Sequence, residues 1–142
     1  MRMWGINPKL LCDKHLIGEH GEIHKHRHNF VKQHSIAKRI SPVVQIEPQN
    51  MEIRHNQLAN EMTARGFNHN SPYELPDLSY LSTNERNAKV DIQNSINDLT
   101  NRCPECHKRI CNNITKVGQE YLQQIVENDK LNYNNYCIYQ IC

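Results

Sequence analysis

The chain has 142 residues, a length that normally forms one domain with a modest core, and we expect residues 1–142 to do so. Hydrophobic residues make up 37% of it and the mean hydropathy is -0.80, so a few amphipathic helices must supply the core. No stretch approaches the roughly 20 apolar residues of a membrane span, and the first residues lack the apolar segment of a secretory signal. The composition thus excludes a membrane protein and favours a cytoplasmic protein that is not secreted.

The formal net charge of +2 hides an uneven distribution. Residues 1–46 carry eight Lys and Arg against three acids, whereas residues 47–142 carry nine against twelve. No acid occurs between Glu22 and Glu47, and the basic residues in that interval are Lys25, Arg27, Lys32, Lys38 and Arg39. Such a patch attracts a polyanion, and nucleic acid is the obvious candidate. The alternative is an ordinary solvated helix face.

A long first helix is predicted from about residue 8 to residue 32, because Asn7 and Pro8 form a favourable helix start. Leu16, Ile23 and Phe30 recur every seven residues and should face the core. His15, Gly18, Glu22 and Lys25 fall on another face. Glycine within a helix costs about 1 kcal/mol relative to alanine, so Gly18 and Gly21 indicate either close approach of a ligand or a bend.

The remaining pattern predicts three more helices and two irregular segments. The prolines at 42 and 48 bracket an extended segment or loop. Helices are expected over residues 50–65, stopped by Gly66, and over residues 88–102 and 114–126. Residues 66–86, rich in Pro and Ser, should form a loop that packs against the molecule. The predicted fold class is therefore all-α.

Three segments together resemble the pyrimidine-dimer DNA glycosylases of the phage endonuclease V type: MRMWGINPKLLCDKHLIGEHGEIH, LANEMTARGFNHNSP and AKVDIQNSINDLTNR. They occur in collinear order over residues 1–106, which is more specific than any one motif. The resemblance implies a compact helical enzyme that flips a base out of damaged double-stranded DNA, cuts its glycosidic bond and nicks the strand as an abasic-site lyase. It also implies a monomer without a cofactor, working in the nucleoid or a virus-infected cell. Residues 107–142 stay unassigned.

In this family the nucleophile is the α-amine of the N-terminal residue, and the essential carboxylate is a glutamate on the first helix. The resemblance maps the glutamate to Glu22, and the family spacing back from it ends on Met1. Arg2 is too large for removal of the preceding methionine, so Met1 should be retained. A terminal amine has a pKa of about 7.7–8.0 and needs little adjustment to act as a neutral nucleophile, and Arg2 would lower that pKa further.

One departure from the family is Gly21, where the phage enzyme has arginine. A second departure is the helix around Asn94 and Asp98, which carries basic residues in the phage enzyme. DNA contacts should therefore shift toward residues 25–39, where His26, His28 and His34 are also expected on the exposed surface. The expected substrate-binding residues are Arg2, His15, Gly18, Gly21, His24, Lys25, Arg27, Lys32, Lys38 and Arg39.

Two groups of residues invite a metal hypothesis. His20 and His24 lie at i and i+4 around Glu22, which would suit a zinc-dependent hydrolase, but the spacing is not H-E-x-x-H and no third ligand is evident. Cys103-x-x-Cys106 is half of a zinc ribbon. Candidates for its other half are Cys137 with Cys142, or His107 with Cys111. We expect no metal at either place, and a DNA-binding module without catalysis is the further alternative.

Overall fold

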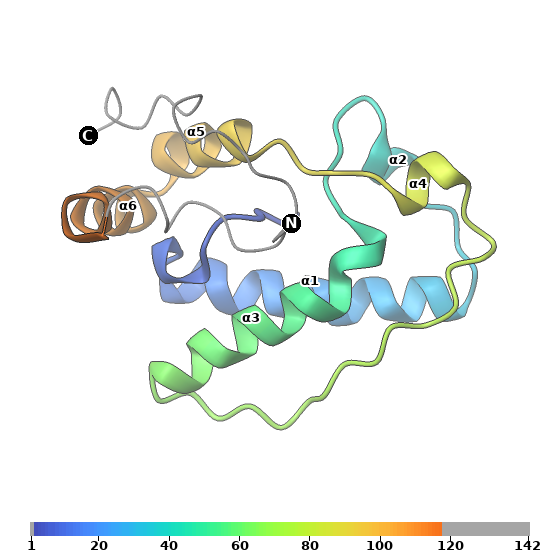
Figure 1. Ribbon diagram of the computed structural model, residues 1–142, viewed down its shortest axis with the longest axis horizontal. Helices are drawn as coiled ribbons and strands as arrows, with labels where there is room; N and C mark the ends of the chain where they lie inside the picture. Colours follow the sequence, from blue (N-terminus) through green and yellow to red (C-terminus); the bar gives the residue numbers. More distant parts are fainter. Residues whose placement is uncertain (1, 118–142) are drawn as a thin grey trace.

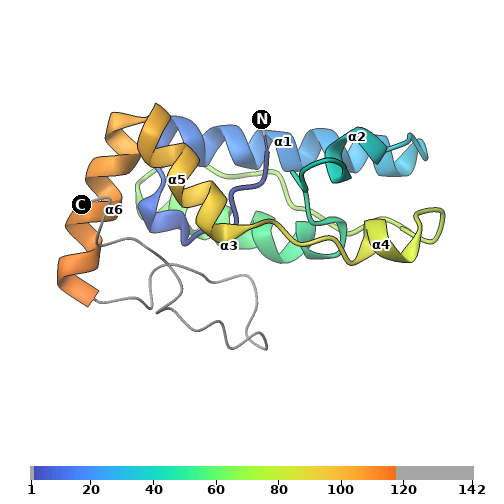
Figure 2. The same ribbon diagram turned by 90° about the horizontal axis from the view of Figure 1, so that it is seen from above.

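The computed structural model describes the backbone of residues 2–117 and the side chains of residues 2–112. All regular secondary structure in this part of the chain is helical, which confirms the predicted fold class. It consists of two short 3-10 turns and six α-helices: η1 (Pro8–Leu10), α1 (Asp13–Val31), α2 (Ala37–Ile40), η2 (Pro48–Asn50), α3 (Met51–Ala64), α4 (Thr83–Arg86), α5 (Ile92–Arg102) and α6 (Pro104–Val117). Helices α5 and α6 lie at one end of the molecule and α2 and α4 at the other (Figures 1 and 2).

The centre of the molecule is the contact between α1 and α3. Leu16, Ile23 and Phe30 of α1 are buried, as their seven-residue spacing predicts. They pack in one cluster with Leu58 and Met62 of α3. The segment from Met3 to Asn7 is also buried throughout, so the beginning of the chain is part of this core.

The first helix begins at Asp13, five residues later than predicted. The predicted cap does form, because the Asn7 side chain accepts a hydrogen bond from the amide of Lys9. That turn ends at Leu11, whose backbone is extended. Leu10 and Leu11 are both fully buried, so burial of two consecutive leucines replaces a continuous helix by a short turn and a new start at Cys12.

The later elements also differ from their predicted bounds. Helix α5 begins four residues late, where the Asp91 side chain accepts a hydrogen bond from the amide of Asn94. The last predicted helix, residues 114–126, overlaps the structure only at the end of α6, which starts at Pro104; residues 118–126 lie outside the described chain. Helices α2 and α4 were not predicted, although Ser82 and Glu85 form a capping box at α4.

The segment between α3 and α4 is packed down, as predicted. Gly66 ends α3 with a positive φ of 88°, the backbone conformation that favours glycine at this position. Tyr73, Leu78 and Leu81 are buried, and the Tyr80 hydroxyl donates a hydrogen bond to the carbonyl of His34. This long loop is therefore fixed against α1 and its C-terminal end.

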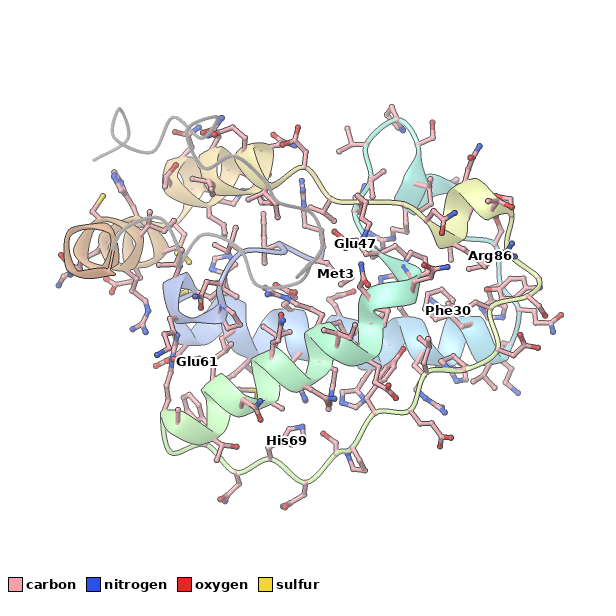
Figure 3. All side chains as sticks on the ribbon, viewed as in Figure 1. Met3, Phe30, Glu47, Glu61, His69 and Arg86 are labelled. Carbon is pink, nitrogen blue, oxygen red and sulfur yellow. The ribbon has the colours of Figure 1, made fainter. Side chains whose placement is uncertain are left out.

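Glu47 joins three separate segments near the centre of the molecule. Its side chain is buried and accepts hydrogen bonds from the side chain of Asn50 and the amide of Val90. Its own amide lies 3.2 Å from the sulfur of Met3, and the two residues are neighbours in Figure 3. None of the helices in the described residues is long and apolar enough to cross a membrane.

Candidate active site

The residues that come after Met1 are held against α1 by specific contacts. The amide of Met3 donates a hydrogen bond to the carbonyl of Gln45 at 2.8 Å, and the amide of Trp4 donates one to the carboxylate of Glu19 at 3.2 Å. From Trp4 the chain continues to η1 and then to the start of α1. The segment that precedes Trp4 therefore starts from a point fixed beside Glu19, one helical turn from Glu22.

Glu19 is the anchor of this arrangement. Its carboxylate forms a fully buried ion pair with Arg54 of α3, and both side chains have 0% exposure. Arg54 also donates a hydrogen bond to the carbonyl of Ile6 at 2.6 Å. One ion pair thus fixes the first segment, α1 and α3 relative to one another. Glu19 lies within the first of the three segments that resemble the glycosylase family, but its partner Arg54 was not predicted from the sequence.

Glu22 lies one helical turn beyond Glu19, with its side chain 18% exposed. One of its carboxylate oxygens is 3.7 Å from Nε2 of His26. His26 was predicted on the exposed surface and that was wrong, because it is 2% exposed and packs beside Phe30. Burial lowers the pKa of His26 and Glu22 opposes only part of that effect, so a neutral imidazole adjoins the carboxylate at neutral pH.

The predicted DNA-binding cations fall into two groups. Lys25, Lys32 and Lys38 are exposed. The guanidinium groups have protein partners: Arg27 donates to the carbonyl of Glu74 and Arg39 to the side chain of Gln45. Arg2 donates to Ser95, lies 3.9 Å from Asp98 and stands over the ring of Trp4. The lysines are therefore the cations best placed to meet phosphate.

The two glycines of α1 do not interrupt it, since the helix runs from Asp13 to Val31. Gly21 is exposed, and a Cβ atom added there would have no neighbour within 4 Å. At 3.6 residues per turn, Gly18, Gly21 and Lys25 lie within about 60° of one another around the helix, and Lys25 lies about 60° from Glu22. The helix surface next to Glu22 thus has no side chain at its two glycines and carries the charge of the exposed Lys25.

The opposite flank of α1 carries a cluster of four histidines, which we call the histidine cluster: His20 and His24 of α1, His55 of α3 and His69 of the following loop. Burial and the other three histidines lower the pKa of His20 to about 4. A pocket of about 510 Å³ adjoins His24 and is also lined by Arg27 and Tyr73. Successive helical residues turn by about 100°, so Glu22 points roughly away from both His20 and His24. No third ligand for His20 and His24 was predicted from the sequence, whereas the fold brings His55 and His69 beside them.

His15, one of the expected substrate-binding residues, lies in a second group with Cys12, Cys103 and Cys106, which we call the cysteine cluster. Its Nδ1 is 3.2 Å from the sulfur of Cys12 and 3.5 Å from that of Cys106. Cys12 was missed as a partner of Cys103 and Cys106, although Cys12-x-x-His15 has the same short spacing as Cys103-x-x-Cys106. Cys137 and Cys142 lie outside the described residues, as does Met1.

The described residues therefore combine an all-helical body, a glutamate of α1, Glu19, that binds the amide of Trp4, and exposed lysines in α1 and in the segment that follows it. A family model described as pyrimidine dimer DNA glycosylase matches residues 1–75. The chain belongs to this family of DNA repair glycosylases, whose substrate is DNA. The match ends in the loop after α3, so it contains Glu22 and all the predicted DNA-binding residues but not α5 or α6. No curated protein and no solved structure matches the chain significantly.

Proposed function

We propose that this glycosylase also acts as an abasic-site lyase on pyrimidine-dimer or related damage, with the α-amine of Met1 as nucleophile and Glu22 as acid and base. The amine attacks C1′ of a nucleotide rotated out of the duplex, and the glycosidic electron pair leaves with the base. The amine nitrogen loses a proton, and the C1′–O4′ bond breaks with its electron pair going to O4′, which is protonated, so that a protonated Schiff base forms at C1′. This Schiff base loses a C2′ proton, and β-elimination breaks the 3′ C–O bond to phosphate. Water then hydrolyses the imine and releases the enzyme.

The observation that carries this proposal is the hydrogen bond from the amide of Trp4 to Glu19. Glu22 comes one turn later, and a helical turn advances about 5.4 Å. Three residues of extended chain span up to about 10 Å, so an amine three residues before Trp4 has the reach to meet the Glu22 carboxylate. The burial of the Met3–Asn7 segment supports a fixed rather than a mobile approach.

The role of Glu22 is inferred from its surroundings. A carboxylate beside C1′ stabilises the positive charge that develops on the sugar and relays protons during imine formation and elimination. His26 packs against it as a neutral group and limits contact with water. We therefore expect Glu22→Gln to lower glycosylase activity by about 10²–10⁴-fold while unfolding by urea is unchanged. Glu105→Gln, an exposed residue of α6, is the control.

Trapping with borohydride tests the nucleophile. Borohydride reduces an imine to a stable amine, so the full chain incubated with dimer-containing duplex should form a covalent adduct, and peptide mapping should place it on the peptide that contains Met1. A tag fused before Met1 should abolish the adduct while salt-dependent DNA binding remains. An adduct on an internal lysine would refute the nucleophile, and binding without adduct or cleavage would instead indicate a DNA-binding module.

The histidine cluster does not favour a zinc-dependent hydrolase that uses Glu22. His20 and His24 contact His55 and His69, on the flank of α1 that faces α3, whereas Glu22 contacts His26. Cleavage that survives a chelator agrees with the Schiff-base proposal, and cleavage abolished by a chelator and restored by zinc contradicts it.

A further inference from the structure

The cysteine cluster is assembled from two short motifs that begin two helices. Cys12 is the residue before α1 and His15 lies in its first turn. Cys103 is the residue between α5 and α6, and Cys106 lies in the first turn of α6. Each motif places two ligand atoms on one side of a helix start. Figures 1 and 2 show the start of α1 and α6 together at one end of the molecule.

The distances between these four side chains agree with a tetrahedral zinc ion. Zn–S bonds of about 2.3 Å and Zn–N bonds of about 2.0–2.1 Å separate two sulfur ligands by about 3.8 Å and a sulfur from a nitrogen by about 3.6 Å. The sulfurs of Cys12 and Cys103 are 3.7 Å apart, and Nδ1 of His15 is 3.5 Å from the sulfur of Cys106. All four ligand atoms lie within 4.8 Å of one another, and the three cysteines are free thiols.

Backbone groups around the cluster suit thiolates rather than thiols. The amide of Cys12 donates to the sulfur of Cys106 at 3.3 Å, and the amide of Cys106 donates to the sulfur of Cys103 at 3.4 Å. Such N–H···S contacts stabilise negative charge on metal-bound sulfur and orient the ligands. A closed set of three cysteines and one histidine, without an open position, is typical of a structural zinc site.

We propose that Cys12, His15, Cys103 and Cys106 bind one structural Zn²⁺. The ion joins the start of α1, the helix that carries Glu22, to the junction of α5 and α6, which lies beyond the residues that match the family. His15 then acts as a zinc ligand, and the expected role of this residue in substrate binding is not needed. His107 and Cys111, the alternative partners of Cys103 and Cys106, are not members of the group.

Elemental analysis of the full chain, purified without chelator, tests the site directly. Cys12→Ser and Cys103→Ser should each lose one zinc per chain, whereas Cys137→Ser should lose none. His15→Ala should weaken zinc binding by at least about tenfold in a chelator competition, since loss of even an outer partner of a metal ligand costs that much. Cobalt substitution of the unmutated chain should give the thiolate charge-transfer bands of a tetrahedral site, which requires no variant to fold.

Two results would overturn the proposal. One is an unmutated chain that binds no zinc at stoichiometric level after reconstitution. The other is equal loss of zinc in Cys137→Ser and Cys12→Ser, which would point to the ligand set with Cys137 and Cys142.

The histidine cluster carries a second, independent proposal. Nε2 of His69 lies 2.9 Å from Nε2 of His20 and 3.3 Å from Nε2 of His55, close to the roughly 3.4 Å that separates two nitrogens on a tetrahedral zinc ion. Nε2 of His24 is buried and has no hydrogen-bond partner. Figure 3 shows His69 between its loop and α3. A set of four imidazoles suits zinc, copper or nickel.

We infer that His20, His24, His55 and His69 bind one transition-metal ion, which holds the loop after α3 against α1. The unmutated chain should then hold two ions, and His69→Ala should reduce the content to one. His28→Ala is the matched control, because His28 is an exposed histidine of α1. Metal content that stays at one ion per chain under zinc, copper and nickel, and falls to zero in Cys12→Ser, would refute this second site and leave the first intact.

Discussion

Glu19 illustrates how one residue fixes the course of a chain. Its two carboxylate oxygens accept hydrogen bonds from the amide of Trp4 and the guanidinium of Arg54, and Arg54 in turn holds the carbonyl of Ile6. The pair has no access to water, so each charge is balanced only by the other and by these backbone groups. Such a pair is sensitive to the loss of either partner.

Glu19→Gln should therefore destabilise the protein by about 3–5 kcal/mol, because it preserves the size of the side chain and leaves the Arg54 charge buried without its counterion. Urea unfolding of the purified variant measures this loss. Asp13→Asn is the matched control: Asp13 pairs with Arg65 at 3.0 Å but is 65% exposed, and its replacement should cost less than about 1 kcal/mol. Equal losses in both variants would contradict this account.

At the scale of the residue, the sequence predicts those functional residues whose partners lie close to them in the chain. Glu22 was singled out by the resemblance to the glycosylase family, whose spacing back from the glutamate ends on Met1 within the same segment, and its catalytic role stays a prediction. The partners of Glu19, His15 and His20 could not be predicted, because Arg54, Cys103, Cys106, His55 and His69 come from distant segments that only the packed helices bring close. His26 was misplaced since a histidine among basic residues gives no indication of burial.

At the scale of the element, α1 combines a buried stripe with a smooth exposed face. Its core residues have a regular heptad spacing and were predictable. The start of α1 was not, since it depends on the burial of Leu10 and Leu11 by the rest of the fold. The start of α5 is set by the cap at Asp91, which the prediction from residue 88 overlooked. Gly21 and Gly66 separate two effects of glycine: a Cβ atom meets nothing within 4 Å at either position, but only Gly66 has a positive φ.

Gly21→Ala should raise the free energy of unfolding by about 1 kcal/mol, because alanine loses less backbone entropy in a helix than glycine. Gly66→Ala should lower it by about 1 kcal/mol or more, because an L side chain is strained at a φ of 88°. Thermal unfolding compares the two variants. If the bare face of α1 receives DNA, Gly21→Ala should also reduce cleavage, and unchanged cleavage would show that DNA does not approach at Gly21.

At the scale of the whole molecule, positive charge is concentrated on the N-terminal half of the sequence, and the structure indicates which cations remain available. Lys25, Lys32 and Lys38 are exposed, whereas Arg27 and Arg39 are held by Glu74 and Gln45. The sequence predicted a basic patch but could not distinguish these two groups, because the partners of the arginines come from other segments.

The salt dependence of DNA binding should therefore come from contacts between these exposed lysines and the phosphates of DNA. Lys25→Gln and Lys32→Gln should each reduce the slope of log K against log salt by up to about 0.9, which is the value for one phosphate contact. Lys108→Gln changes an exposed lysine of α6 and should leave the slope unchanged. Fluorescence anisotropy with a dimer-containing duplex measures all three. An equal slope for every variant would exclude phosphate contacts by these lysines.

Removal of zinc should lower the stability of the whole fold. A ligand present at about 100 times its dissociation constant stabilises the folded state by about 2.7 kcal/mol, so a zinc chelator should lower the Tm by about 10 °C in a chain of this size. Cys12→Ser should already have the lower Tm before any chelator is added. The chelator should then cause no further decrease in Tm through the cysteine cluster. A single transition in both states would also agree with the prediction of one domain.

The contact between Arg2 and Ser95 joins residues that are 93 positions apart in the chain. During synthesis the first segment leaves the ribosome long before Ser95 and α5 exist, so Arg2 gains this contact only after Glu19 and Arg54 are both available to hold Trp4 and Ile6. The contacts of Arg2 with α5 are therefore the last to form around the first segment.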